Sequence, residues 1–288
     1  MISQHWPAPA KLNLMLHITG RRSDGYHLLQ TLFQFLDFGD ELSFEITDSP
    51  EIIALFEMED LPAEQNLIIR AARALQQQSG CNKGVKIDLI KQLPMGGGLG
   101  GGSSDAATTL VALNHLWGLH LSIDKLAEIG LNLGADLPIF IHGHSAWAEG
   151  VGEQLQSVTL PEPWFLVINP QIKVSTADIF NARELTRDCP PITIRDLISD
   201  GVLSSGLINI CQSVVTERYP AIADALKWLN HFGDARLTGT GACLFASFKS
   251  QSEATNVLEQ LPEQWHGFVA QGRNLSPLMQ RLEKAASE

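Results

Sequence analysis

Six glycines fall between residues 96 and 102, and this stretch constrains the fold more than any other part of the chain. It follows an apolar run at residues 85–90 that predicts a strand, and it precedes a run with helical spacing at residues 107–117. Ser103 and Ser104 stand between the two, and serine favours helix N-caps. A glycine-rich backbone at a helix N-terminus brings together free N–H groups and the positive end of the helix dipole. This arrangement predicts an anion site, most simply for phosphate. A flexible linker is the alternative, but linkers do not normally separate a buried strand from an amphipathic helix.

Three familiar phosphate loops do not fit this stretch. A Walker A loop needs a lysine and then serine or threonine after its last glycine, whereas Gly102 is followed by Ser-Ser-Asp. A dinucleotide fingerprint can be traced through Gly96, Gly98 and Gly101. With so many glycines that match is nearly automatic, and the acid expected on a following strand is absent. A protein-kinase glycine loop would require an HRD element elsewhere in the chain, and the sequence contains none.

The bulk composition indicates a globular protein with a real core. Of the 288 residues, 44% are hydrophobic and 18% are charged, which excludes a disordered chain and allows one large domain or two of ordinary size. The net charge of −12 argues against nucleic acid or an anionic membrane as a partner. No apolar stretch is long enough to span a bilayer, and the N-terminal MISQHWPAPAK lacks the apolar core of a signal peptide.

The residue types that bind metals show no metal-site spacing. His142 and His144 form a pair that could bind zinc, but no third ligand of suitable spacing follows. The four cysteines are far apart and also lack such spacing: Cys81, Cys189, Cys211 and Cys243. A reducing cytoplasm is the simplest location for this chain.

The remaining pattern mixes helices and strands without strict alternation, which indicates the α+β class. Residues 11–19 alternate in polarity and predict a half-buried strand, on which Lys11 and Asn13 point the same way, about 7 Å apart. Asn66, Ser122 and the pair Ser175 and Thr176 are expected to cap helices. Further strands are expected at residues 42–46, 145–148, 164–168, 243–248 and 268–270, and further helices near residues 207–217, 222–232 and 252–261. A Pro-Glu-Pro break at residues 161–163 predicts a domain boundary between 1–160 and 161–288.

Three separated motifs stand in order along the chain. They are PAKLNL at residues 9–14, the glycine stretch with its flanks (PMGGGLGGGSS, residues 94–104), and LTGTGA at residues 237–242. Their order and spacing resemble the three motifs of the GHMP kinase superfamily of small-molecule kinases, over nearly the whole chain. Two further segments, DGYH at residues 24–27 and LNLGAD at residues 131–136, resemble one branch of that superfamily. Members of this branch use ATP to phosphorylate a tertiary hydroxyl of a cytidine-diphosphate-linked methylerythritol in isoprenoid precursor synthesis.

The resemblance implies a two-domain fold. The N-terminal half is expected to be ribosomal-protein-S5-like and to bind ATP, and the C-terminal half is expected to be ferredoxin-like, with the site in the cleft between them. It also implies the catalytic pair. Asp136 matches the catalytic aspartate, a base or hydrogen-bond acceptor for the substrate hydroxyl. Lys11 matches the catalytic lysine, which lowers the hydroxyl pKa and offsets developing phosphoryl charge. Without the resemblance, a turn aspartate and a strand lysine would be read as solvated charges.

The resemblance also assigns residues to the nucleotide. The triphosphate of ATP is expected in the glycine stretch, with a serine hydroxyl, assigned to Ser104, touching Mg²⁺. Asn66 and Lys91 are candidates for adenine contacts, although helix capping and a solvated charge explain them equally well. The full set expected at ATP is Pro94, Met95, Gly96, Gly97, Gly98, Leu99, Gly100, Gly101, Gly102, Ser103, Ser104, Asn66 and Lys91.

At the other end of the expected cleft the resemblance places the substrate. Tyr26 and Phe180 match aromatics that sandwich the cytosine base, and His27 matches the residue that reads the base edge by hydrogen bonds. Asn13 and Thr176 are expected at the diphosphate or the polyol. Gly239 and Gly241 are expected to permit close backbone approach behind the loop, although a purely structural turn explains them nearly as well.

The function expected from the resemblance is therefore ATP-dependent phosphorylation of the 2-hydroxyl of a cytidine-diphosphate-linked methylerythritol, with Mg²⁺. Two alternatives remain open. One is another kinase of the superfamily, of the homoserine or mevalonate type, and the other is a nucleotide-binding regulator without turnover. The expected partners are the small-molecule substrate and ATP, without nucleic acid or membrane, and the expected assembly is a monomer or homodimer.

Overall fold

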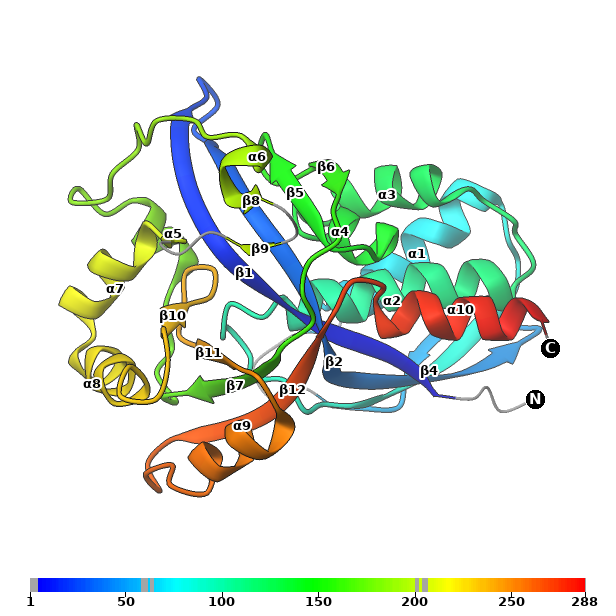
Figure 1. The fold of residues 1–288 in the computed structure, drawn as a ribbon. Coiled ribbons are helices and arrows are strands. Elements are labelled where there is room, and N and C mark those ends of the chain that lie inside the picture. The colour runs from blue at the N-terminus through cyan, green and yellow to red at the C-terminus, as the bar shows by residue number, and fades with distance from the viewer. Residues whose placement is uncertain (1–4, 58–61, 63–64, 200–201, 204–206, 288) are drawn as a thin grey trace.

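Two long antiparallel strands run through the whole molecule. In the computed structural model, which describes residues 5–57, 62, 65–199, 202–203 and 207–287, β1 (Trp6–Arg21) pairs along its length with β2 (His27–Thr47). Figure 1 shows the pair crossing from one end of the molecule to the other. The N-terminal residues 1–4, part of the segment tested above for a signal peptide, lie outside the described residues.

The prediction of a half-buried strand with strict alternation was wrong in both respects. Lys11 and Asn13 are 3% and 4% exposed, nearly as buried as Leu12 between them, because both faces of β1 are covered. The pairing register shifts between Asn13 and Met15, so one residue is inserted as a bulge. As a result Leu14 and Met15, adjacent in the chain, pack into the same hydrophobic cluster.

Ten of the described strands form one large, mainly antiparallel sheet. Its path runs β10-β11-β7-β12-β2-β4-β3, with β1 and β5 also paired to β2, and β6 paired to β5. The one parallel pair in this sheet is β3 with β4. The bounds are β3 (Ile52–Ala54), β4 (Gly84–Ile90), β5 (Ala146–Glu149), β6 (Gln154–Ser157), β7 (Trp164–Asn169), β10 (Arg236–Leu237), β11 (Leu244–Phe248) and β12 (His266–Arg273); a separate small pair joins β8 (Ile198–Ser199) and β9 (Val202–Leu203).

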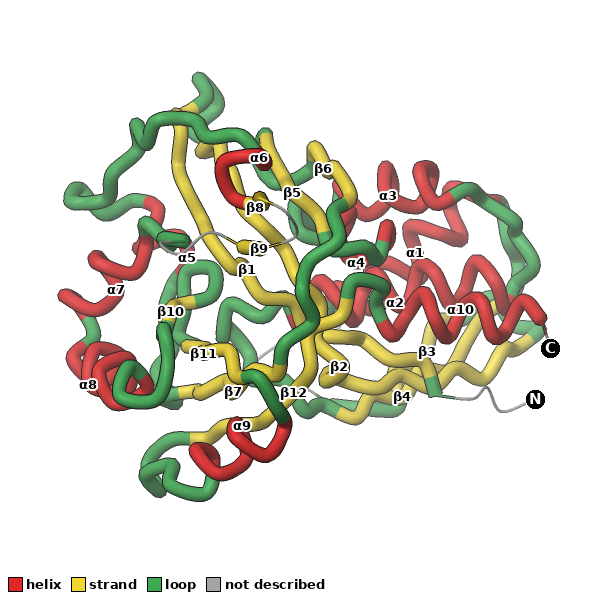
Figure 2. Tube along the Cα trace, viewed as in Figure 1, coloured by secondary structure: helices red, strands yellow, loops and turns green. Residues whose placement is uncertain are grey.

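The helices stand in groups around this sheet. Figure 2 shows α1 to α4 and α10 at one end of the molecule and α5, α7 and α8 at the other, with strands between them. The bounds are α1 (Leu67–Ser79), α2 (Gly101–Leu116), α3 (Ile123–Leu131), α4 (Leu137–His142), α5 (Thr176–Phe180), α6 (Ile194–Leu197), α7 (Cys211–Arg218), α8 (Pro220–Leu229), α9 (Gln251–Leu258) and α10 (Pro277–Ser287). The mixture of sheet and helices is α+β, as the sequence predicts. Among the described helices, none has the length and apolar composition needed to cross a membrane.

Helix caps explain where several of these helices begin. Asn66, Ser122 and Ser175 each accept a backbone N–H with the side chain and cap α1, α3 and α5, as predicted. The prediction for α2 was wrong, because this helix begins at Gly101 and its N-cap is Gly100. The two serines after the glycine stretch lie within the first turn. Their place in that turn matters for the site described below.

The hydrophobic core continues across the predicted domain boundary. Leu12 of β1 shares a cluster with Phe165 of β7 and Phe245 of β11. Helix α10, which the sequence patterns above do not predict, returns from the C-terminal half to pack on β1 and α2. One sheet and the last helix thus join the two predicted domains. The domain boundary between residues 160 and 161 remains a proposal.

Candidate active site

The glycine stretch forms a tight loop between β4 and α2. Gly96, Gly98 and Gly100 all have positive φ, and at Gly98 an added Cβ would lie 2.2 Å from the carbonyl oxygen of Thr238. The second glycine motif packs directly behind this loop, since the Thr238 hydroxyl donates to Gly98 O at 3.2 Å and the Cys243 N–H donates to Gly97 O at 3.1 Å. Glycine is required at Gly98 because backbone from a distant segment fills the space of a side chain.

Lys11 joins the first strand to this loop. Its ammonium donates to Asn13 Oδ1 at 2.5 Å and to the carbonyl oxygen of Gly98 at 2.8 Å, and its backbone N–H donates to Leu99 O at 3.0 Å. Burial lowers the pKa of the Lys11 ammonium, and the charge of Asp136 opposes this shift. A negatively charged group that enters the cavity is attracted to this buried cation.

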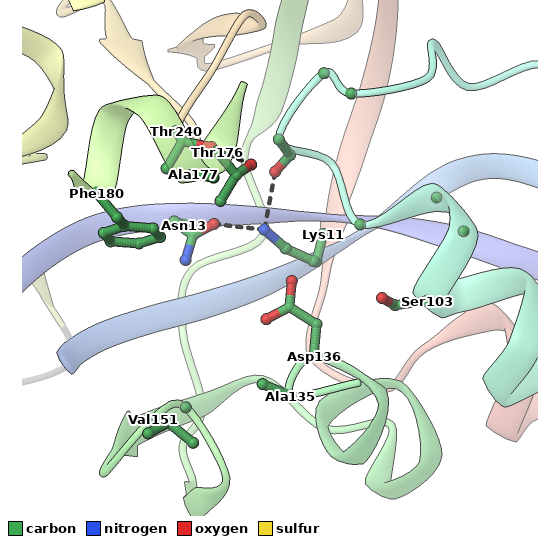
Figure 3. A pocket seen from close by; sticks show the side chains of 18 of the residues that line it. Lys11, Asn13, Ser103, Ala135, Asp136, Val151, Thr176, Ala177, Phe180 and Thr240 are labelled. Carbon is green, nitrogen blue, oxygen red and sulfur yellow. Dashed lines mark hydrogen bonds between the residues drawn. The ribbon is translucent and has the colours of Figure 1, made fainter. Parts of the chain in front are cut away.

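Asp136 faces Lys11 across the cavity. A turn follows α3, in which the N–H of Gly134 donates to the carbonyl oxygen of Gly130, and Asp136 comes directly after this turn. Asp136 occupies the N-cap position of α4, but its side chain does not cap the helix. Figure 3 shows its carboxylate pointing toward the Lys11 ammonium. The fold therefore brings a carboxylate and an ammonium from distant parts of the chain to one side of the glycine loop.

A cavity of about 880 Å³ contains this pair and most of the predicted residues. Four polar residues that the sequence predicts at the ligands line it: Asn13, Asn66, Lys91 and Thr176. The glycine-loop residues that line it are Pro94, Met95, Gly96, Gly97, Gly98, Gly100, Gly101, Gly102 and Ser103, and Gly239 lines it beside Gly98. At the opposite end it is lined by Tyr26, His27 and Phe180.

Three predicted site residues do not reach the cavity. Ser104 is completely buried, and its hydroxyl donates to the carbonyl oxygen of Pro9 at 2.7 Å, so the structure does not support its assignment to Mg²⁺. Leu99 packs in the core at 1% exposure. Gly241 faces Leu237 on the far side of its turn. For Ser104 and Leu99, neighbours distant in the chain decide the orientation, and the local pattern carries no information about them.

Lys91 occupies a different environment from the solvated one considered for it. Its ammonium forms ion pairs with Asp40 and, at 2.9 Å, with Asp105. Burial raises the pKa of Asp105, Lys91 lowers it and the nearby Asp40 raises it, with a net result of about 7. Burial lowers the pKa of Lys91 but the two carboxylates outweigh it, so that this pKa is raised. Asp105 lines the cavity, and sequence reasoning missed it although it directly follows the serine pair.

The opposite end of the cavity is aromatic. Phe180 stacks on the ring of His27, with centroids 5.1 Å apart and planes 21° apart, whereas Tyr26 is 62% exposed. Arg187, which no sequence motif indicated, donates its Nε–H to His27 Nε2 at 3.1 Å. Burial lowers the pKa of His27, and the charges of Arg187 and Arg21 lower it further. This imidazole is thus kept neutral beside a flat apolar surface.

Polar groups connect the two ends. Asn13 donates its amide to Thr31 Oγ1 at 2.9 Å while its Oδ1 accepts from Lys11, so its orientation is fixed. The hydroxyls of Thr176 and Thr240 lie 2.9 Å apart on the side opposite Asp136 (Figure 3). Within the described part of the chain, no group of three or more His, Cys, Asp or Glu side chains could hold a metal ion.

Comparison with known proteins identifies relatives of the whole chain. The family model for the GHMP kinases N terminal domain matches residues 66–144, and that for GHMP kinases C terminal matches residues 194–267. The chain is 56% identical to a 4-diphosphocytidyl-2-C-methyl-D-erythritol kinase of Nitrosococcus oceani, covering 97% of this chain and 98% of that protein. It is 58% identical to the kinase of that name from Ectopseudomonas mendocina, over 98% of this chain and 95% of that protein.

A solved structure is similar over nearly the same length. The crystal structure of a 4-(cytidine 5'-diphospho)-2C-methyl-D-erythritol kinase superposes with a TM-score of 0.83 at 30% identity, covering 93% of this chain and 99% of that one. The GHMP kinase fold that the three sequence motifs imply is therefore confirmed.

Proposed function

The chain belongs to the 4-diphosphocytidyl-2-C-methyl-D-erythritol kinase family of the GHMP kinases, and on that premise we propose that it phosphorylates the 2-hydroxyl of 4-diphosphocytidyl-2-C-methyl-D-erythritol with ATP. This reaction is a step of non-mevalonate isoprenoid precursor synthesis. One observation carries the proposal. A single cavity joins the Lys11–Asp136 pair and the glycine loop at one end to the stacked His27–Phe180 pair at the other.

The chemistry assigned to the pair follows from phosphoryl transfer. As the hydroxyl oxygen attacks the terminal phosphorus, the bond to the leaving oxygen of ADP breaks and the hydroxyl proton passes to Asp136. The transition state is loose and highly charged, so catalysis depends mainly on position and charge. Lys11 supplies the charge. Two of its N–H groups bind protein in the described structure, and the third remains for a phosphoryl oxygen.

The start of α2 suits the triphosphate. The first backbone N–H groups of this helix have no partner within it, and together with the helix dipole they attract phosphate oxygens. The glycine loop lets these oxygens approach the backbone closely. Asn66 and Lys91 line the same end of the cavity, and we place the adenine near them, with Lys91 oriented by Asp40 and Asp105.

The donor set also fits Mg²⁺. Ser103 and Asp136 bring oxygen ligands to the cavity, and Mg²⁺ in kinases takes one or two such ligands together with substrate phosphates. The hydroxyl of Ser103 thus replaces that of Ser104 in this role. When bound, the ion neutralises phosphate charge.

At the other end we assign the cytosine base to Tyr26, His27 and Phe180, and the diphosphate or polyol to Asn13 and Thr176. The exposure of Tyr26 leaves its ring available to close over a base. Each stacked ring contributes roughly 1–3 kcal/mol of binding. We further propose a cytoplasmic location and a monomer or homodimer, since the site described here needs no second chain.

Turnover with competing alcohols tests the proposal. ADP release is measured with the cytidine-diphosphate alcohol, with homoserine and with mevalonate, and the product is identified by mass. We expect kcat/KM for the first to exceed the others by at least about 1,000-fold, because the base end adds contacts that the smaller alcohols lack. Equal or better turnover of homoserine or mevalonate overturns the substrate assignment. ADP release that no alcohol stimulates overturns the kinase assignment itself.

A further inference from the structure

Arg187 lies behind the stacked pair and is anchored by four hydrogen bonds. It belongs to the segment between α5 and α6, and it does not line the cavity. Its Nη2 donates to the carbonyl oxygens of Phe180 and Ala182, both at 2.7 Å, and its Nη1 donates to that of Leu185 at 3.0 Å. The remaining Nε–H donates to Nε2 of His27 at 3.1 Å. The guanidinium therefore has a fixed direction with respect to the imidazole.

The direction of this last bond determines the state of the histidine. A guanidinium has five N–H donors and no acceptor, and it stays protonated, so the His27 Nε2 must be the acceptor. An imidazole nitrogen that accepts carries no proton. In the neutral ring the single proton is then on Nδ1. No residue of the described structure is bonded to Nδ1, and the ring lines the cavity, so this N–H is available to a ligand.

We propose that Arg187 is a positioning residue that fixes His27 as an Nδ1–H donor and thereby selects cytosine over uracil. The inference rests on the cytidine substrate proposed above. The two bases differ at ring nitrogen N3, which is an acceptor in cytosine and an N–H donor in uracil. A fixed donor on His27 pairs with the first and opposes the second, leaving two donors without acceptors. Burial, and after it the charges of Arg187 and Arg21, lower the pKa of His27 and so favour the neutral ring.

Base preference in a variant tests the proposal. In Arg187→Met either ring nitrogen of His27 can carry the proton, so the ring can accept the N3–H of uracil. We expect the wild-type protein to prefer the cytidine alcohol over its uridine-diphosphate analogue by at least about 100-fold in kcat/KM. We expect Arg187→Met to reduce that preference at least about tenfold, in part by gaining turnover of the uridine analogue, while KM for ATP stays within about twofold. A residue that only held the fold together would not produce this gain.

Arg218→Met is the matched control. Arg218 anchors the same region through Glu184 and the carbonyl oxygen of Asp178, without contact to His27. This variant should keep the wild-type base preference. Arg187→Lys, which retains a charge and a donor, is the second variant and should restore part of the preference. Arg187→Met loses the three hydrogen bonds from Arg187 to carbonyl oxygens, and this loss is the main threat to its folding. If it does not fold, Arg187→Lys replaces it in the test.

Nitrogen NMR of the ligand-free protein reads the tautomer directly. The wild-type spectrum should show a pyrrole-type Nδ1 and a pyridine-type Nε2 for His27, and this pattern should be lost in Arg187→Met or, if that variant does not fold, weakened in Arg187→Lys. A protonated Nε2 in the wild type overturns the inference, and so does an unchanged base preference in a folded variant. If the wild type turns over neither nucleotide alcohol, the proposed function and the base selectivity both fail. The tautomer assignment is still decided by the spectrum.

Discussion

The ammonium of Lys11 donates a hydrogen bond to the carbonyl oxygen of Gly98 at 2.8 Å. This contact connects the first strand to the middle of the glycine loop, and the backbone N–H of Lys11 reinforces it by donating to Leu99 O. The catalytic cation proposed here therefore also binds the loop at which we propose that the phosphates bind. Replacing either Lys11 or Gly98 should therefore alter the position of the other residue.

Replacing Lys11 by Met removes the charge and keeps an unbranched side chain. We expect kcat to fall at least about 100-fold, roughly 3 kcal/mol, with a smaller change in KM for ATP, because the cation acts mainly on the transition state. Burial lowers the pKa of Lys11, with Asp136 in opposition, so wild-type activity should decline at alkaline pH before the ordinary value of 10.5 is reached. A pH profile of kcat checks both points. A variant that turns over within about tenfold of the wild type contradicts the assigned role.

Replacing Asp136 by Asn keeps the shape and removes the proton acceptor. We expect kcat to drop by about 100-fold or more while the Kd for ATP, measured by calorimetry, changes less than about threefold. The control is Asp124→Asn in the first turn of α3, away from the cavity lining. It should leave turnover at the wild-type level. An equal loss in both variants would mean that the effect at Asp136 is a general one on folding.

Gly98 should not tolerate a side chain. In Gly98→Ala the Cβ would meet the carbonyl oxygen of Thr238 at 2.2 Å, and φ is +77°. We expect a loss of about 2 kcal/mol or more in the free energy of unfolding. Gly102→Ala is the matched control, since Gly102 lies in α2 with open space around it, where alanine is the better helix former. Thermal unfolding without nucleotide should separate the two variants clearly, and equal melting temperatures would contradict the close contact.

Asp105→Asn should change how stability depends on pH. Burial, reinforced by Asp40 and opposed by Lys91, raises the pKa of Asp105 to about 7 from its ordinary 3.8. Between these values the folded chain keeps a proton that the unfolded chain has lost, so wild-type stability falls as pH rises through this window. The variant lacks this proton. Its free energy of unfolding relative to the wild type should therefore grow by on the order of 1–3 kcal/mol from about pH 4 to about pH 8. Urea unfolding at both pH values measures it, and a constant difference refutes the assignment.

Phe180→Ala should weaken binding of the alcohol substrate and leave binding of ATP unchanged. We expect KM for the cytidine alcohol to rise about tenfold or more through loss of one stacking surface, with KM for ATP unchanged within about twofold. Phe232→Ala is the control, because Phe232 is a partly exposed aromatic that contacts Trp228 outside the cavity lining. Parallel rises of both KM values would place Phe180 in the general packing of the site.

Some elements could be predicted because their causes lie within a few residues. Asn66 begins α1 and Ser122 begins α3, since a cap is a bond between near neighbours. The start of α2 was missed for a tertiary reason. Ser104 is drawn inward to the carbonyl oxygen of Pro9, so it does not cap the helix and does not face the cavity. The bulge after Asn13 escaped prediction as well, because it depends on pairing with β2.

By itself the sequence determined the order of motifs, the glycine-rich loop ahead of a helix, the kinase family and most of the residues that line the cavity. Only the tertiary structure decided which atoms meet: Lys11 with Gly98, Lys91 with its two carboxylates, and Arg187 with His27. The reason is physical. Backbone turns and caps follow from local residue chemistry, whereas the direction of a buried side chain follows from the packing of segments that are far apart in the chain.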